Sequence, residues 1–325
     1  MGAVGEKRTL LVTGAAGYIG QATVRHALRD GHTVKAVLRP GRPVPDALAG
    51  AEIVFADLVT DNDRLAKALR NVDVVIHAAG SFSSDADTSM RDTIQASSGL
   101  LDAMSQAAVS RVVLVSSIAI YGYQGAAKLD ESAELETHFD QRDAYCRAKS
   151  EQENLFRTHA GLDLTVLRVG AVWGPNRLFN AHLGVSTGPL FLRIGNATDI
   201  PTCHIETCAS ALVSASCQAS TPTCNVINIL DDDRTDARRY LKAVQKCGWP
   251  KRVLPVPLFP LLTLAKALPA SLQRVGLLKP ATLAARFGAV QYSNKRLHMC
   301  LEDVTMVTFE DAMTDAIKNT DGSKA

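Results

Sequence analysis

Short runs of apolar and β-branched residues alternate with helical stretches through the first half of the chain. The runs are continuously apolar instead of alternating, which is typical of a sheet covered by helices on both faces. A helix is predicted at residues 18–30. Strands are predicted at Arg8–Val12, Thr33–Leu38, Glu52–Phe55, Val72–His77, Arg111–Ser116 and Leu164–Arg168. This alternation predicts an α/β fold, a doubly wound parallel sheet of the Rossmann type.

The pattern changes after Pro175. Residues 176–200 have the composition of a loop, and Val226–Leu230 predicts a strand that returns to the sheet. Helices are expected at about 236–247 and 308–318, on either side of a proline-broken apolar stretch at 253–278. We therefore expect a smaller C-terminal lobe beside the parallel sheet.

Charge and composition exclude several classes of protein. The 325 residues include 35 Lys and Arg against 33 Asp and Glu, a formal charge of +2. This near-balance argues against a general nucleic-acid or acidic-lipid surface as the main activity. The longest strongly apolar run, Val253–Ala265, is too short for a bilayer, which needs about 20 residues, so no stable membrane insertion is predicted.

Cysteine usage indicates the compartment. The seven cysteines are an odd number and are absent from the first 145 residues, which is unlike a disulfide framework. We expect reduced, buried thiols and a cytoplasmic protein. Cys203, His204 and Cys208 lie close in sequence, but no second pair completes four ligands, so no metal site is predicted.

A glycine-rich turn directly follows the first strand, in the sequence TGAAGYIG. Such glycines allow a tight turn and a close approach of the backbone to a pyrophosphate, which the next helix N-terminus attracts. The placement between a strand and a helix predicts a dinucleotide site. The residues expected to contact the cofactor in this turn are Gly14, Ala16, Gly17, Tyr18, Ile19 and Gly20.

The end of the second predicted strand indicates which dinucleotide binds. An NAD site has a carboxylate there for the ribose 2′-hydroxyl, whereas an NADP site has a cation for the 2′-phosphate. Arg39 follows Leu38, and no acidic residue occurs between Thr33 and Pro45, which predicts NADP(H). Further contacts with this cofactor are expected from Asp57, Leu58, Ala78, Ala79, Gly80, Ser116, Tyr145, Lys149, Val169, Gly170 and Val172.

Tyr145 and Lys149 are four residues apart at the start of a predicted helix, which places them on one face. A phenol has an ordinary pKa of about 10, and a neighbouring ammonium would lower it toward the range useful for proton transfer. Ser117, at the end of the strand VVLVSS, would donate a hydrogen bond to a substrate oxygen. The order of these motifs along the chain predicts a catalytic triad.

These motifs resemble the extended short-chain dehydrogenase/reductase family, also called the NAD(P)-dependent epimerase/dehydratase family. The resemblance extends from TGAAGYIG through DVVIHAAG, VSSIAIYG, YCRAKSEQE, LRVGAVWGPN and CHIETCASAL to YSNKRL. It implies that Ser117, Tyr145 and Lys149 are catalytic, and that a homodimer forms through the helices at about 90–108 and 145–160. Thr93 stands where many members have Asn, so a water-bridged proton relay through this position is in doubt.

The resemblance also implies a division of the chain. Residues 1–176, with 201–230 returning to them, are expected to form the dinucleotide-binding domain. Residues 177–200 and 231–325 are expected to form the substrate-binding lobe.

Family patterns distinguish among the possible reactions. Ser117 is followed by Ile118 and Ala119 where dehydratases of the family have Asp-Glu, and Arg168-Val169-Gly170 lacks the Asn typical of nucleotide-sugar epimerases. Arg39 in AVLRP resembles the dihydroflavonol-reductase and hydroxysteroid-dehydrogenase branch. The expected protein is an NADP(H)-dependent oxidoreductase acting on a ketone or secondary alcohol. An NAD-dependent nucleotide-sugar epimerase and a non-catalytic NADP-binding sensor or scaffold are the alternatives.

The apolar composition of the C-terminal lobe favours a hydrophobic ring substrate. An equally weighted alternative is that these residues only pack the lobe. The pocket walls we predict are Phe82, Ile118, Trp173, Phe179 and Phe191.

Overall fold

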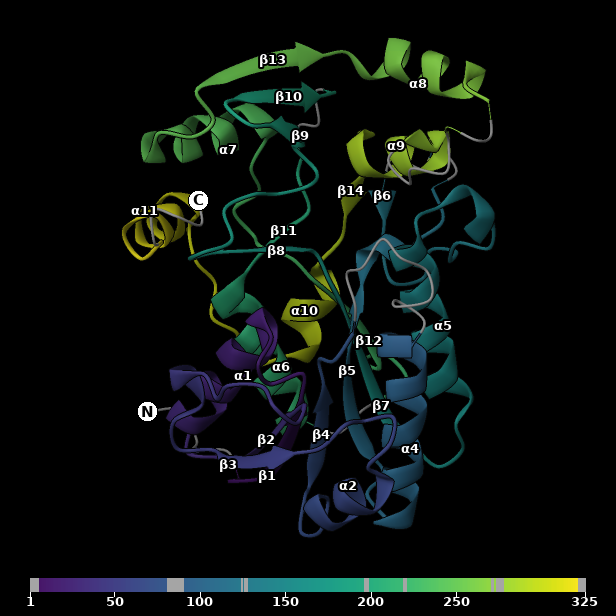
Figure 1. Cartoon of the computed structure of the whole chain (residues 1–325), viewed down its shortest axis with the longest axis vertical. Coiled ribbons are helices and arrows are strands. Elements are labelled where there is room, and N and C mark those ends of the chain that lie inside the picture. The colour runs from purple at the N-terminus through teal and green to yellow at the C-terminus, as the bar shows by residue number, and fades with distance from the viewer. Residues whose placement is uncertain are drawn as a thin grey trace.

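A parallel sheet forms the centre of the computed structural model, which describes residues 6–80, 91–123, 125, 128–195, 199–218, 221–269, 272 and 278–320. In that part of the chain the sheet has seven strands, in the order β12-β7-β5-β4-β1-β2-β3, and every neighbouring pair is parallel (Figure 1). Their bounds are β12 Val226–Ile229, β7 Asp163–Val169, β5 Arg111–Ser117, β4 Val74–His77, β1 Thr9–Thr13, β2 Thr33–Leu38 and β3 Glu52–Phe55. The predicted strands, including the returning one, are confirmed.

Helices cover both faces of this sheet (Figure 1). Leu10 and Val12 of β1 belong to a core cluster with residues of α1 (Tyr18–Arg29), α6 (Ile205–Cys217) and α10 (Lys295–Cys300). Leu11, between them, belongs to a second cluster with α2 (Asn62–Ala68), α4 (Ala96–Gln106) and α5 (Ala144–Thr158). Successive side chains of one strand thus enter opposite cores, which is why the runs are continuously apolar.

The C-terminal elements form a separate three-stranded sheet with helices around it. Its strand order is β13-β10-β9. The bounds of these strands and helices are β9 Gly184–Thr187, β10 Leu190–Ile194, β13 Arg252–Val256, α7 Ala237–Val244, α8 Leu258–Ala267, α9 Pro280–Phe287 and α11 Phe309–Lys318. The prediction of a loop at 176–200 is therefore wrong, because β9 and β10 form an antiparallel hairpin there.

Two short strand pairs connect the C-terminal elements to the rest of the chain. β8 (Ala171–Trp173) pairs with β11 (Thr202–His204), and β6 (Lys128–Leu129) pairs with β14 (Gln291–Tyr292). Because β6 follows the end of β5, the second pair brings the segment before α10 to the same edge of the sheet.

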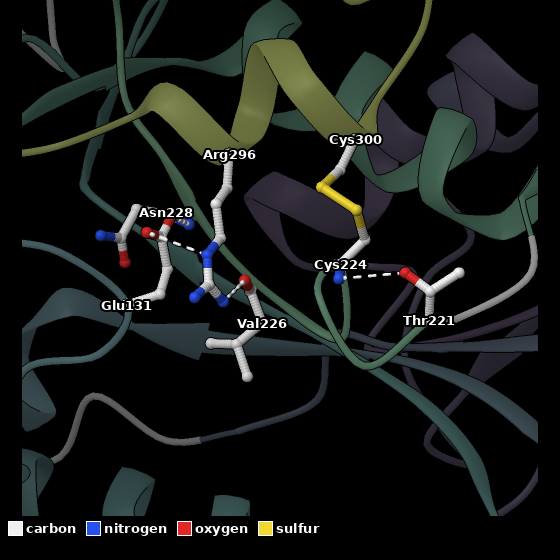
Figure 2. The surroundings of a disulfide bond; sticks show 7 residues. All are labelled: Glu131, Thr221, Cys224, Val226, Asn228, Arg296 and Cys300. Atoms are coloured by element: carbon white, nitrogen blue, oxygen red, sulfur yellow. Dashed lines mark hydrogen bonds and ion pairs between the residues drawn. A yellow bond between two sulfur atoms is a disulfide. The ribbon is translucent and has the colours of Figure 1, made fainter.

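A disulfide joins Cys224, just before β12, to Cys300 at the end of α10 (Figure 2). The prediction that all the cysteines are reduced thiols is wrong for this pair. The two residues are 76 positions apart, and only the packing of α10 against β12 brings their Cα atoms to 5.6 Å. The other five cysteines are free thiols, and Cys203 and Cys208 among them are buried in the core.

Candidate active site

The predicted catalytic residues meet at one edge of the parallel sheet. β1, β4, β5 and β7 are neighbours in the sheet and end at this edge, and β1 lies between β2 and β4, where the strand order reverses. Such a switch point is where doubly wound sheets bind ligands. A cavity of about 1500 Å³ lies here. Its lining includes the predicted residues Ile19, Ala78, Gly80, Ser116, Ser117, Tyr145, Lys149, Val169, Gly170 and Val172.

The turn between β1 and α1 has the geometry of an anion cradle. Gly14 has a φ of +66°, and a Cβ atom there would lie 2.8 Å from the backbone nitrogen of Ala79. The amide of Gly17 donates to the carbonyl of Gly14 at 2.9 Å, and Gly17 caps α1 without any side chain. The first amides of α1 consequently have no side-chain cap. A diphosphate would require such uncapped amides as hydrogen-bond donors.

The turn residues Ala16 and Tyr18 lie beside the cradle. The phenol of Tyr18 donates to the carbonyl of Pro175 at 3.0 Å, which holds the segment after β8 against the start of α1. Burial raises the pKa of Tyr18, so this phenol stays protonated. Gly20, in the first turn of α1, packs against the backbone of Gly14. A larger residue at position 20 would not fit there.

The three residues expected at the adenosine end, Arg39, Asp57 and Leu58, follow the ends of β2 and β3 and lie outside the cavity lining. Arg39 is half-exposed, and its Nη2 lies 3.1 Å from a carboxylate oxygen of Asp92. The carboxylate of Asp57 accepts from the amide of Val59 at 2.8 Å and closes a local turn. Leu58 is buried in the second core cluster.

Ser117 and Tyr145 are hydrogen-bonded to each other on the cavity wall. Ser117 is the last residue of β5, and Tyr145 lies in the first turn of α5, which Asp143 caps by accepting from the amide of Cys146 at 2.9 Å. Burial raises the pKa of Tyr145 to about 12, although the bond from Ser117 and the positive charge of Arg177 act against this. A phenol with this pKa is protonated at neutral pH, so it carries the proton that a reduction would require, although its pKa lies farther from neutrality than that of a free phenol.

Lys149 lies one turn after Tyr145 on α5, as predicted, but the pKa of the phenol is raised by burial and not lowered as expected. Its ammonium donates to the carbonyl of Val115 at 2.8 Å and to Oε1 of Gln152 at 2.9 Å. The positive charge of Arg177 lowers the pKa of the phenol in part, against the larger effect of burial. Burial lowers the pKa of Lys149 to about 8. Gly80 lies close to this ammonium, because a Cβ atom at this position would lie 3.2 Å from the Lys149 nitrogen and would displace it by a few tenths of an ångström.

A buried polar network that the sequence analysis missed supports Lys149. Nε2 of Gln152 donates to Oγ of Ser97 at 2.8 Å and lies 3.1 Å from Nε2 of His77. Nδ1 of His77 is 2.7 Å from the hydroxyl of Thr13. Burial and the charge of Lys149 lower the pKa of His77 to about 3, so the ring is neutral. Because these residues come from β1, β4, α4 and α5, no local motif indicates their contact.

Thr93 and Ser116, two further residues considered in the sequence analysis, belong to the buried polar groups around the cavity. Thr93 is buried, and its carbonyl accepts from Oγ of Ser97. Ser116 donates to a carboxylate oxygen of Glu153 at 2.7 Å, and Arg168 pairs with the same carboxylate at 2.6 Å. The buried Glu153–Arg168 pair therefore fixes the ends of β5 and β7 beside the cavity.

The predicted substrate residues divide into two groups. Ile118 and Phe179 line the cavity. Trp173 and Phe191 do not, because both are fully buried in the core of the C-terminal elements, where the indole of Trp173 donates to Asp231 at 2.8 Å. Phe82 lies outside the described residues.

The cavity wall on the substrate side is both aromatic and charged. Its aromatic members, besides Phe179, are Tyr121, Tyr123, Phe139, Trp249 and Tyr292. Its charged members are Asp140, Arg142, Asp143, Arg147, Arg177, Lys279 and Arg286. Several of these come from α9 and the segments around it, so the C-terminal elements close the cavity opposite the sheet.

Comparison with known proteins identifies the family. A family model described as NAD(P)H-binding matches residues 14–176, half of the chain. The chain belongs to the extended short-chain dehydrogenase/reductase family. Enzymes of this family are NAD(P)-dependent reductases, epimerases and dehydratases. The resemblance stated from the sequence motifs is thereby confirmed.

Curated relatives of this family member include reductases. The chain is 32% identical to cinnamoyl-CoA reductase 1 of Arabidopsis thaliana over 185 residues, 52% of this chain and 54% of the relative. It is 30% identical to a 3β-hydroxysteroid dehydrogenase/Δ5→4-isomerase of Mycobacterium tuberculosis over 211 residues, 58% of this chain and 56% of the relative. The matched segments thus span about half the length of the curated relatives.

Solved structures agree with the fold over nearly the whole chain. The structure of gox2253 superposes with a TM-score of 0.77 at 20% identity and covers 96% of this chain and 98% of its own. MoeE5 in complex with UDP-glucose and NAD superposes with a TM-score of 0.69 at 21% identity, covering 95% and 97%. At these identities the agreement concerns the fold alone.

Proposed function

We propose that the protein is an NADP(H)-dependent oxidoreductase that interconverts a ketone and a secondary alcohol on a hydrophobic ring substrate. The observation that carries the proposal is the hydrogen bond between Ser117 and Tyr145 on the wall of a cavity that also receives Lys149. The aromatic wall of the cavity supports a ring substrate, and two relatives are named as cinnamoyl-CoA reductase and putative dihydroflavonol 4-reductase.

The protein's own groups perform the proton transfer and stabilise charge. NADPH supplies the hydride for reduction when it is bound. Tyr145 donates its phenolic proton to the carbonyl oxygen as that oxygen gains negative charge. Ser117 donates a hydrogen bond to the same oxygen, and the buried ammonium of Lys149 favours the phenolate that remains. The uncapped amides of α1 and the glycine turn hold the diphosphate of the cofactor.

Replacement of the phenol tests this reaction. Tyr145→Phe removes the proton donor and leaves the glycine turn intact, so ketone-dependent NADPH oxidation should fall by at least about a thousandfold. NADPH affinity, measured by fluorescence titration, should change less than about threefold. Tyr123→Phe, on the aromatic side of the same cavity, is the matched control and should retain most activity. Turnover by Tyr145→Phe at the wild-type rate contradicts the mechanism.

The preference for NADP(H) is a separate part of the proposal. Arg39 at the end of β2 would exchange its contact with Asp92 for bidentate contact with the 2′-phosphate. Arg39→Ala should therefore weaken NADPH binding by about ten- to a hundredfold and leave NADH binding unchanged. Arg42→Ala, three residues away in the same exposed segment, is the control. Equal losses for both cofactors would overturn the preference.

A nucleotide-sugar substrate is the second candidate. The basic wall residues Arg177, Lys279 and Arg286 suit a diphosphate, and one relative is dTDP-4-dehydro-6-deoxy-D-allose reductase of Streptomyces. An epimerase of this kind retains NAD through its cycle. Purified protein that carries bound NAD and converts UDP-sugars without added cofactor would favour this candidate over the ketone reductase.

The proposal also covers the oligomeric state of the protein and its location in the cell. We infer a homodimer in which α4 and α5 of two copies pack together, which light scattering tests directly. We also propose a cytoplasmic location, which the five free thiols of the described chain support and the Cys224–Cys300 disulfide opposes. Cell fractionation tests it.

A further inference from the structure

One long segment of the chain is positively charged throughout. Between Ala237 and Leu301 there are twelve Lys and Arg residues and no Asp or Glu, although the whole chain has a net charge of only +2. The segment includes α7, β13 and α8, which lie at the end of the molecule opposite α2 (Figure 1). The balanced total charge therefore conceals a basic segment, and part of this segment forms that end of the molecule.

Several cations at this end have no acidic partner. Lys246, Lys251, Arg252 and Lys266 are exposed, and none of them forms an ion pair with another residue in the described part of the chain. They lie just before β13, at its start and on α8. Cations that are not used within the protein are available to an anionic partner.

The same two elements expose large apolar side chains. Leu258, Leu261, Leu262 and Ala265 of α8 pack inward in a cluster with Ile194, Leu283 and Phe287. On other sides of these elements Phe259 is 80% exposed, Leu264 60% and Leu254 50%. A helix that is apolar on both its inner and outer faces is not explained by packing against the lobe alone.

We propose that the surface of β13 and α8 binds lipid bilayers that contain anionic lipids. We call it the lipid-binding surface and define it by Leu254, Phe259, Leu264, Lys251, Arg252 and Lys266. Apolar side chains that enter the acyl boundary, together with cations near the head groups, are the combination by which interfacial helices bind. None of the described helices is both long and apolar enough to cross the bilayer, so the contact is peripheral.

Charge and shape favour a bilayer over other anionic partners. A nucleic acid would use the cations through its phosphates but would gain little from Phe259 and Leu264. α8 lies at the tip of the molecule, where a flat surface can reach it without contacting the parallel sheet (Figure 1). α8 also packs against α9, whose Thr282, Ala285 and Arg286 line the cavity. The surface therefore adjoins the substrate wall, although the binding itself does not depend on the proposed reaction.

Vesicle flotation of the full chain tests the proposal. Vesicles of phosphatidylcholine with about 30% phosphatidylserine should bind the protein at least about tenfold better than phosphatidylcholine alone. Phe259→Ser combined with Leu264→Ser should lower binding to the anionic vesicles at least about tenfold. Lys251→Gln, Arg252→Gln and Lys266→Gln together should do the same and should remove most of the salt dependence.

Matched variants outside the lipid-binding surface provide the control. Met299→Ser removes an exposed apolar side chain of α10, and Lys67→Gln with Arg70→Gln removes charges at and just after α2; binding should stay within about twofold. Unchanged thermal melting of every variant confirms that each is folded. Equal binding of the Phe259→Ser, Leu264→Ser variant and the wild type, or duplex DNA binding as tight as vesicle binding, overturns the proposal.

Discussion

Lys149 is the residue whose environment most directly controls the proposed chemistry. Its pKa is about 8 because burial disfavours the ammonium, so the charge is present below pH 8 and lost above it. Tyr145 remains protonated through this range. We therefore expect kcat/KM for ketone reduction to be level near neutrality and to fall tenfold per pH unit above about pH 8. A pH–rate profile with saturating NADPH measures it.

Gln152 stabilises the charged form of Lys149 and therefore affects the pH at which activity falls. Its amide oxygen accepts from the ammonium, and a hydrogen bond to a charged group is worth about 1.5–3 kcal/mol. Gln152→Met should therefore move the alkaline limb to lower pH by about one unit or more. Gln141→Met, at an exposed position before α5, should leave the limb unchanged. If Gln152→Met lowers activity equally at every pH, Gln152 has only a structural role.

Residues in contiguous motifs could be predicted from the sequence, whereas residues defined by contacts between distant elements could not. Tyr145 and Lys149 share one helix turn, and the glycine turn is continuous with its strand, so spacing alone indicates their geometry. Gln152 and His77 are 75 positions apart, and their contact depends on the packing of α5 against the sheet. Trp173 and Phe191 were misjudged because a large aromatic residue serves a core as readily as a pocket wall.

At the scale of elements, α10 is held to β12 by two links that the sequence did not indicate. Arg296 donates to the carbonyl of Val226 at 3.3 Å and lies 3.7 Å from a carboxylate oxygen of Glu131, and Cys300 is bonded to Cys224 (Figure 2). The odd cysteine count argued against such a bond. The hairpin of β9 and β10 was also missed, because its strands are short and its partner β13 follows about 60 residues later.

The disulfide should contribute measurably to stability. It closes a segment of 76 residues, and the loop-closure model assigns about 4.5 kcal/mol to a crosslink of this length, whereas measured values usually fall within about 2–5 kcal/mol. Cys224→Ser with Cys300→Ser should lower the unfolding free energy by that amount in urea titrations. Cys247→Ser, at a free thiol, is the control. A double variant as stable as the wild type would mean that the bond does not constrain the unfolded chain.

At the scale of the whole molecule, charge is segregated although the total is nearly balanced. The segment from Ala237 to Leu301 is basic. Because the whole chain has a net charge of only +2, the rest of the chain is acidic. Net charge alone argued against an anionic surface as partner, because a sum does not record position. The architecture, in contrast, followed from the sequence, since continuous apolar strands have few stable arrangements other than a sheet covered on both faces.

Buried histidines make the stability of the whole molecule sensitive to acid. Burial lowers the pKa of five of them, namely His26, His32, His77, His182 and His204. For His77 the value is about 3, against 6.5 for the free side chain. Between these values the unfolded chain binds a proton that the folded chain does not, so stability falls as pH decreases.

His77 permits a quantitative test. At pH 5 its contribution to the unfolding free energy should be about 2 kcal/mol lower than at pH 7. Glu153, whose pKa is lowered by Arg168, adds to the loss only below its ordinary value of 4.5. Urea unfolding at pH 7 and pH 5 should therefore show a decrease that His77→Gln reduces by about 2 kcal/mol. His138→Gln, at a side chain 66% exposed, should leave it unchanged. An acid loss equally large in His77→Gln would show that His77 is protonated in the folded protein.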